Sequence, residues 1–262
     1  MLSADVVREV ARTLGPIDVD VMPVKGALMQ HWLYDDPADR AMTDVDILVR
    51  APDLERAREA LAAAGYVFLG QTGLGACLMR APVGLALDLH PRLFDSARYR
   101  LTTDAVFARS TFDETLYGVR VHLPSLLDAY AHLIGKFGSD HLNAAATERL
   151  DEIVRMGRHL ASSGEGLAAS AVAAHLVDVG MGRVSRYVLG LASQSNDSTA
   201  AAVLAALPRD AVGTAIVSCV DPVLRSRWSE SPAGASAAHM LNHSLTASCR
   251  SAARALVHRM AG

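Results

Sequence analysis

Two aspartates separated by one residue, Asp44 and Asp46, open the short apolar run TDVDILV at residues 43–49. Alternate side chains of a strand face the same way, so both carboxylates project from one face of a strand expected over residues 45–49. Close carboxylates repel each other unless a cation lies between them, and oxygen ligands suit Mg²⁺. The pair therefore predicts a metal site. The alternative is two polar residues on a solvated strand face. That is our interpretation of the equally spaced Asp18 and Asp20, which stand at the start of an expected strand and not behind a Gly-containing turn and the helix that follows it.

A third carboxylate, Asp88, lies in the middle of the apolar strand expected over residues 85–90. Burying it without a partner would be costly. If this strand pairs beside residues 45–49, Asp88 joins Asp44 and Asp46, and three carboxylates can hold two metal ions and activate a hydroxyl for in-line attack on phosphorus. His90 faces the same side as Asp88, either as a supporting residue or as an ordinary packed histidine.

A candidate phosphate-binding turn precedes these strands. Gly26 allows close backbone approach to a phosphate, and the helix expected over residues 26–34 offers its free N–H groups. Lys25 adds a positive charge; it is one of only two lysines, with Lys136, among 25 basic residues. Arg40, in the loop before Asp44, is a second candidate for neutralising phosphate charge, against the alternative of an ordinary surface arginine.

The elements that must position these residues alternate between helix and strand up to about residue 123. Besides the segments above, we expect helices in the first half over residues 3–14 and 53–64. We expect strands over residues 17–24, 66–69 and 76–80, a turn at 81–84, and a strand pair around 112–122. From residue 124 onward the pattern is helical, with helices over 125–137 and 144–160 and an Ala-, Val- and Leu-rich bundle after 167 with loops at 193–198 and 229–236. We therefore predict an α+β fold with an N-terminal catalytic domain, residues 1–123, and a C-terminal helical domain, residues 124–262.

Composition limits the function classes. The chain has 262 residues, 51% hydrophobic and 20% charged, with a net charge of −3. It is long enough for a sizeable core, and no apolar run reaches the roughly 18 residues of a membrane span. The charge balance gives no basic face for sequence-independent binding to long nucleic acids. The three cysteines fit neither a disulfide framework nor a zinc site, and no signal peptide is evident, so we expect a cytoplasmic protein.

These motifs resemble the DNA polymerase β-type nucleotidyltransferase superfamily, and within it a bacterial family whose turn reads Lys-Gly instead of Gly-Gly or Gly-Ser. The resemblance covers roughly residues 15–160 and rests on the segments PVKGA at 23–27, DPADR at 36–40, DVDILV at 44–49 and ALDLH at 86–90. It implies a polymerase β-like mixed sheet with flanking helices. The serine usual in the superfamily turn is absent, because Ala27 follows Gly26.

The resemblance implies a role for each candidate. Asp44, Asp46 and Asp88 would bind two Mg²⁺ ions, with Mn²⁺ as a possible substitute. Asp88 would also act as, or orient, the base that takes the proton of the acceptor hydroxyl. Lys25, Gly26 and Arg40 would bind the nucleotide. Lys136, one turn after His132 on the first helix of the second half, is a further candidate triphosphate ligand, against the alternative of a solvated lysine.

The implied reaction is transfer of a nucleoside monophosphate from an NTP to an acceptor hydroxyl, with release of pyrophosphate. The acceptor is a small molecule, a peptide or protein, or tRNA, and no membrane partner is expected. A non-catalytic relative that serves as a nucleotide sensor or protein-interaction module is the main alternative. A phosphohydrolase that directs the same carboxylates at water is a weaker one.

Overall fold

The structure is a computed structural model that describes residues 2–72, 75–95, 98–139, 146–163, 167–224, 237, 240 and 241. The chain divides into two compact units. The first comprises Met1–Asp95 with Leu101–Ala129, and the second comprises Ser96–Arg100 with Tyr130–Gly262. Each unit is described by itself.

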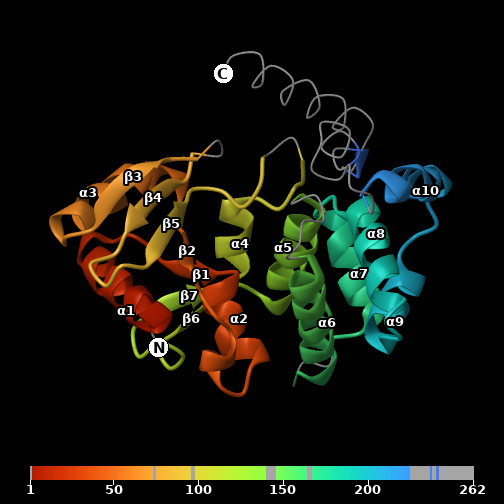
Figure 1. The fold of residues 1–262 in the computed structure, drawn as a ribbon, viewed down its shortest axis with the longest axis horizontal. Helices are drawn as coiled ribbons and strands as arrows, with labels where there is room; N and C mark the ends of the chain where they lie inside the picture. The colour runs from red at the N-terminus through yellow and green to blue at the C-terminus, as the bar shows by residue number, and fades with distance from the viewer. Residues whose placement is uncertain are drawn as a thin grey trace, which may run out of the picture. The chain divides into compact units, whose positions relative to one another are not determined.

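The first unit is built on a five-stranded mixed sheet in the order β1-β2-β5-β4-β3 (Figure 1). The central pair, β2 and β5, is parallel, and the other neighbours are antiparallel. A separate hairpin joins β6 to β7. The strand bounds are Met22–Val24 for β1, Asp44–Leu48 for β2, Val67–Gln71 for β3, Cys77–Arg80 for β4, Ala86–His90 for β5, Thr111–Asp113 for β6 and Val121–Leu123 for β7.

The helices of the first unit surround this sheet. They are α1 (Leu2–Leu14), α2 (Gly26–Leu33), α3 (Leu54–Ala63) and α4 (Thr103–Arg109), with short 3₁₀ turns at Gly15–Ile17, Pro37–Asp39 and Ala51–Asp53. The second unit is helical in its described residues: most of α5 (Leu126–Ser139), then α6 (Ala146–Ser162), α7 (Ala169–Asp178), α8 (Gly182–Ser193), α9 (Ser198–Ala206) and α10 (Ala211–Leu224). The predicted fold class, a mixed sheet with flanking helices followed by a helical region, is confirmed.

One face of the sheet carries the core of the first unit. Val45 and Ile47 of β2 and Leu87 and Leu89 of β5 are fully buried in a cluster with side chains of α1 and α3. Because successive strand residues alternate between faces, the residues between them point to the opposite face. Apolar burial on one side of β2 and β5 thereby fixes the direction of Asp44, Asp46, Asp88 and His90 on the other.

Two local expectations differ from the structure. The strand expected over residues 17–24 begins only at Met22, because Gly15–Ile17 forms a 3₁₀ turn and Asp18 closes it with a left-handed φ of 53°. The helix α4, capped by the Thr102 side chain, was not predicted. The loop expected at residues 229–236 lies outside the described residues. Among those that are described, no helix combines the length and apolar character needed to cross a bilayer.

Candidate active site

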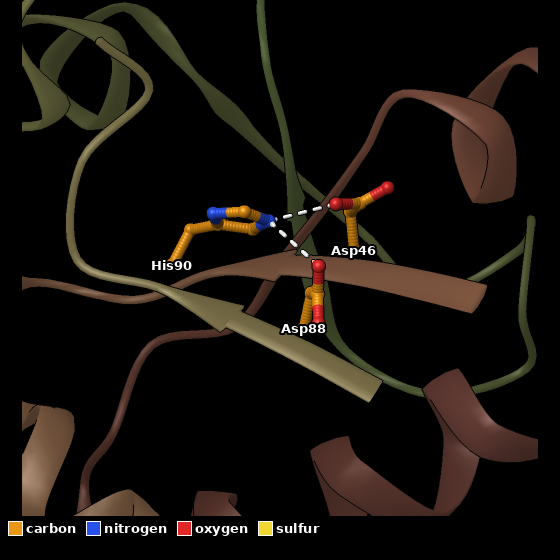
Figure 2. A group of neighbouring side chains, drawn as sticks. All are labelled: Asp46, Asp88 and His90. Atoms are coloured by element: carbon orange, nitrogen blue, oxygen red, sulfur yellow. Dashed lines mark hydrogen bonds and ion pairs between the residues drawn. The ribbon is translucent and has the colours of Figure 1, made fainter. Parts of the chain in front are cut away.

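Asp46 and Asp88 lie side by side on the two parallel central strands. The register pairs Asp46 with Asp88 and Leu48 with His90, so the two carboxylates and the imidazole share one face (Figure 2). Figure 2 shows the His90 ring reaching toward both aspartates. The conditional prediction that the strand of Asp88 pairs beside that of Asp46 is therefore realised in the sheet.

Asp46 is a buried carboxylate held by two nitrogen donors. Its side chain is 6% exposed, and its Oδ1 lies 2.5 Å from Lys25 Nζ and 2.7 Å from His90 Nε2. Burial by itself would raise the pKa of this carboxyl, but the hydrogen bond with His90 and the charge of Lys25 outweigh it and hold the pKa far below its ordinary value. Asp46 is consequently ionised throughout the physiological range.

Asp88 has the opposite environment. Burial and the neighbouring Asp46 carboxylate raise its pKa above the ordinary value. Its Oδ2 lies 4.0 Å from His90 Nε2, and its buried Oδ1 has no hydrogen-bond partner among the described residues. A buried carboxylate oxygen without a donor is costly. This vacant acceptor fits a site that is completed by a bound cation.

Lys25 reaches Asp46 because of the strand that precedes it. The antiparallel pairing of β1 with β2 sets Val24 opposite Asp46, and Lys25 follows at once as the N-cap residue of α2. Its backbone has φ 51° and ψ −128°, a conformation that is strained for any residue other than glycine. Such strain is concentrated at functional sites, and here it accompanies the turn that joins β1 to α2.

Gly26 lies in close contact with the ends of two long side chains, those of Arg40 and Met42. A Cβ at residue 26 would overlap the Arg40 guanidinium and lie 2.8 Å from the sulfur and the methyl carbon of Met42. The loop before β2 therefore packs directly on the first turn of α2. The structure thus brings together three of the predicted nucleotide-binding residues, Lys25, Gly26 and Arg40, at the edge of the carboxylate cluster.

Gln30 is a structural residue that sequence reasoning missed. It is buried on α2, accepts a hydrogen bond from Ser3 Oγ at 2.6 Å, and donates to the carbonyl oxygens of Pro37 at 3.1 Å and Arg40 at 2.7 Å. The side chain thereby ties the loop at residues 37–40 to α2. A lone amide in an otherwise apolar helix sequence was the available signal, because a buried polar group needs partners.

Two other predicted residues lie outside the tight cluster. Asp44 shares the face of Asp46, is paired in register with Ala86, and accepts a hydrogen bond from Thr43 Oγ1 at 3.2 Å. Lys136 lies on α5 within the second unit. Its role as a triphosphate ligand remains a prediction.

The donor set fits a divalent cation. Asp46, Asp88 and His90 each offer one ligand atom, and these atoms all lie within 4.8 Å of one another. Two carboxylates provide the hard oxygen ligands that Mg²⁺ and Mn²⁺ prefer. Together with the Lys-Gly turn, the cluster can neutralise a polyphosphate and place a carboxylate near a reacting hydroxyl.

The match to a protein family covers most of the chain. A model of a family described as uncharacterised nucleotidyltransferases matches residues 2–195, and the chain belongs to that family. The resemblance inferred from the Lys-Gly turn and the aspartate motifs is thereby confirmed. No curated protein sequence gives a significant match.

Solved structures offer distant likenesses of the fold. An antigenic nucleotidyltransferase-like protein from Paracoccidioides brasiliensis is 17% identical over 80% of this chain and 95% of that one, with a TM-score of 0.48. The antibiotic-resistance factor ANT(2'')-Ia is 13% identical over 74% of this chain and 98% of that one, with a TM-score of 0.49. The Thermotoga maritima CCA-adding enzyme, complexed with tRNA, is 9% identical over 84% and 69%, with a TM-score of 0.30. Identities this low do not identify a substrate.

Proposed function

We propose that the protein transfers a nucleoside monophosphate from an NTP to an acceptor hydroxyl and releases pyrophosphate. The observation that carries this proposal is the cluster on β2 and β5, where Asp46 and Asp88 meet beside the strained Lys25-Gly26 turn. Two adjacent carboxylates that can hold metal ions and a turn that carries a lysine are parts that phosphoryl-transfer chemistry uses.

Divalent metal ions belong to this proposal, and the residues present fit them. Asp46 is ionised, and the buried Asp88 Oδ1 has no hydrogen-bond partner within the described part of the chain, so both can serve as metal ligands. Asp44, Asp46 and Asp88 would hold two Mg²⁺ ions, with Mn²⁺ as a substitute. Ions bound there would neutralise the phosphate charge and lower the pKa of the acceptor hydroxyl.

The side chains of this chain have distinct roles in the proposed reaction. Asp88 accepts the proton of the acceptor hydroxyl, whose oxygen attacks the α-phosphorus while the bond to pyrophosphate breaks. Asp88 suits this role better than Asp46, because Lys25 and His90 already contact the Asp46 carboxylate. Lys25 and Arg40 counter the charge of the triphosphate from the turn before α2, where the Gly26 backbone leaves room for close approach.

Thermal unfolding with each NTP, with and without Mg²⁺, tests the binding half of this proposal. A ligand that binds only the folded protein raises the midpoint. We expect a Mg²⁺-dependent rise with at least one NTP in the wild type and none in the double variant Asp44→Asn/Asp46→Asn. The absence of any rise at millimolar nucleotide would contradict the proposal. A rise without pyrophosphate release in the presence of acceptors would instead favour the nucleotide-sensor alternative.

A further inference from the structure

His90 is the third member of the cluster, and its ring nitrogen lies beside both aspartate carboxylates. Its Nε2 lies 2.7 Å from Asp46 Oδ1 and 4.0 Å from Asp88 Oδ2, so it faces the space between the carboxylates (Figure 2). The same nitrogen is therefore within hydrogen-bond distance of Asp46 and within ion-pair distance of Asp88.

The backbone holds the imidazole in this place. His90 ends β5 opposite Leu48, and its carbonyl oxygen accepts a hydrogen bond from Val49 N at 2.9 Å. The side chain is 14% exposed, so the ring has little freedom to swing into solvent. A ligand held on a regular strand is preorganised for a metal ion.

We propose that His90 Nε2 is a direct ligand of a divalent ion shared with Asp46 and Asp88, and that this nitrogen makes the site prefer Mn²⁺ to Mg²⁺. The inference rests on the proposed function and refines the identity of its metal. Mg²⁺ takes oxygen ligands almost exclusively, whereas the affinity of a nitrogen-containing site increases along the transition-metal series. A mixed set of two carboxylates and one imidazole therefore discriminates between the two ions.

The Lys25 ammonium group contacts the same two side chains, those of Asp46 and His90. Its Nζ lies 2.5 Å from Asp46 Oδ1 and 3.4 Å from His90 Nε2. A cationic group therefore lies against both proposed ligand atoms, and a metal ion bound there would have to displace it. The lysine stem is long and flexible, which permits that movement.

Metal binding without nucleotide tests the proposal directly. Pulsed EPR of the Mn²⁺-loaded wild type should show coupling to a coordinated nitrogen, and labelling the protein with ¹⁵N-histidine should change it. Titrations should show that His90→Asn lowers the ratio of Mn²⁺ to Mg²⁺ affinity about tenfold or more. The matched control is His31→Asn, because His31 packs edge-on against Tyr117 and is not a member of the cluster, so both readouts should stay unchanged.

The opposite results have clear meanings. Absence of nitrogen coupling in the Mn²⁺-loaded wild type, or an equal loss of affinity for both metals in His90→Asn, would overturn the proposal, because His90 would then only orient Asp46. The wild-type spectrum decides the matter even if the variant folds poorly. If Mg²⁺-dependent NTP binding persists in that case, only the inference about His90 is wrong. If the wild type binds neither metal even in the presence of NTP, the proposed function is wrong too.

Discussion

Asp46 and Asp88 face each other on adjacent strands but lie in opposite electrostatic environments. Lys25 and His90 compensate the charge of Asp46. Asp88, by contrast, has a carboxylate as its neighbour and a buried oxygen that receives no hydrogen bond from the residues that the structure describes. Metal-free protein is therefore destabilised at one of the two residues and stabilised at the other. A bound cation would offset the electrostatic cost of keeping the Asp88 carboxylate buried beside Asp46.

Substituting each aspartate by its amide should change stability in opposite directions. In metal-free protein at pH 7, Asp46→Asn should lose about 2 kcal/mol, because Lys25 and His90 lose their charged partner. Asp88→Asn should raise the unfolding midpoint, because it removes a buried charge that repels Asp46. Chemical denaturation with EDTA present measures both, and two changes of the same sign would contradict this electrostatic picture.

The pH dependence of the Asp88→Asn effect has a definite sign. The pKa of Asp88 is higher in the folded protein than in the unfolded chain, so ionisation costs stability as the pH rises through the folded pKa. The advantage of Asp88→Asn should be full above the folded pKa and should disappear as the pH falls to about 4, the ordinary pKa of an aspartate. Denaturation curves from pH 7 to pH 4 measure this, and an advantage that grew toward acid would refute the assignment.

Lys25 should affect metal and nucleotide in opposite ways. Lys25→Met removes the cation that competes for Asp46, so Mn²⁺ without nucleotide should bind about tenfold more tightly. The same variant should show a smaller thermal shift with NTP, because the triphosphate loses a counter-charge. Arg58→Gln, an equal charge change on the exposed side of α3, is the control and should alter neither. Weaker metal binding in Lys25→Met would show that the lysine does not compete.

At the scale of elements, the start of α2 and the loop before β2 form one packed structure. Gly26 leaves the space that Arg40 and Met42 fill, and Gln30 ties the same loop to the helix by two hydrogen bonds. Without these contacts, a loop containing a solvated arginine would have no fixed position relative to Lys25. These contacts hold the backbone segments of the two candidate phosphate ligands, Lys25 and Arg40, next to each other.

A methyl group at Gly26 should cancel part of the stability that alanine otherwise adds to a helix. Gly26→Ala should stabilise the protein by at least about 0.5 kcal/mol less than a substitution at an open helical glycine, because the ends of the Arg40 and Met42 side chains must move. Gly190→Ala on α8 is the matched control: no atom of the described residues lies within 4 Å of its Cβ position, so it should stabilise by about 0.5–1 kcal/mol. Thermal or urea unfolding compares the two. Equal stabilisation by both substitutions would mean that Arg40 does not pack against Gly26.

At the scale of the whole molecule, the spacing of apolar residues predicted most helices and strands of the first unit. The elements that it missed have physical causes. The alternation around Asp46 and Asp88 fixed their faces, and the apolar runs implied that their strands are buried neighbours. The late start of β1 was missed because Asp18 takes a left-handed conformation that a β-branched composition does not signal. Gln30 was missed because its partners in α1 and the loop at residues 37–40 are tertiary contacts.

The second unit carries one predicted site residue, Lys136 on α5. If it binds the triphosphate as the resemblance implies, Lys136→Ala should weaken NTP binding about tenfold and leave Mn²⁺ binding without nucleotide unchanged. The exposed Arg155 of α6, which pairs with Asp151, offers the control variant Arg155→Ala. Calorimetric titration of NTP into each protein measures the difference, and equal affinities would exclude Lys136 from the site.

The most direct test of nucleotidyl transfer follows the phosphorus atoms of the donor. Purified protein with Mg²⁺ or Mn²⁺ is incubated with a cell extract and with NTP labelled at either the α- or the γ-phosphate. Transfer of a nucleoside monophosphate predicts that the α-label enters an acceptor, that the γ-label leaves as pyrophosphate, and that Asp46→Asn abolishes both. Release of γ-label as inorganic phosphate with no α-labelled product would contradict nucleotidyl transfer and would indicate a phosphohydrolase.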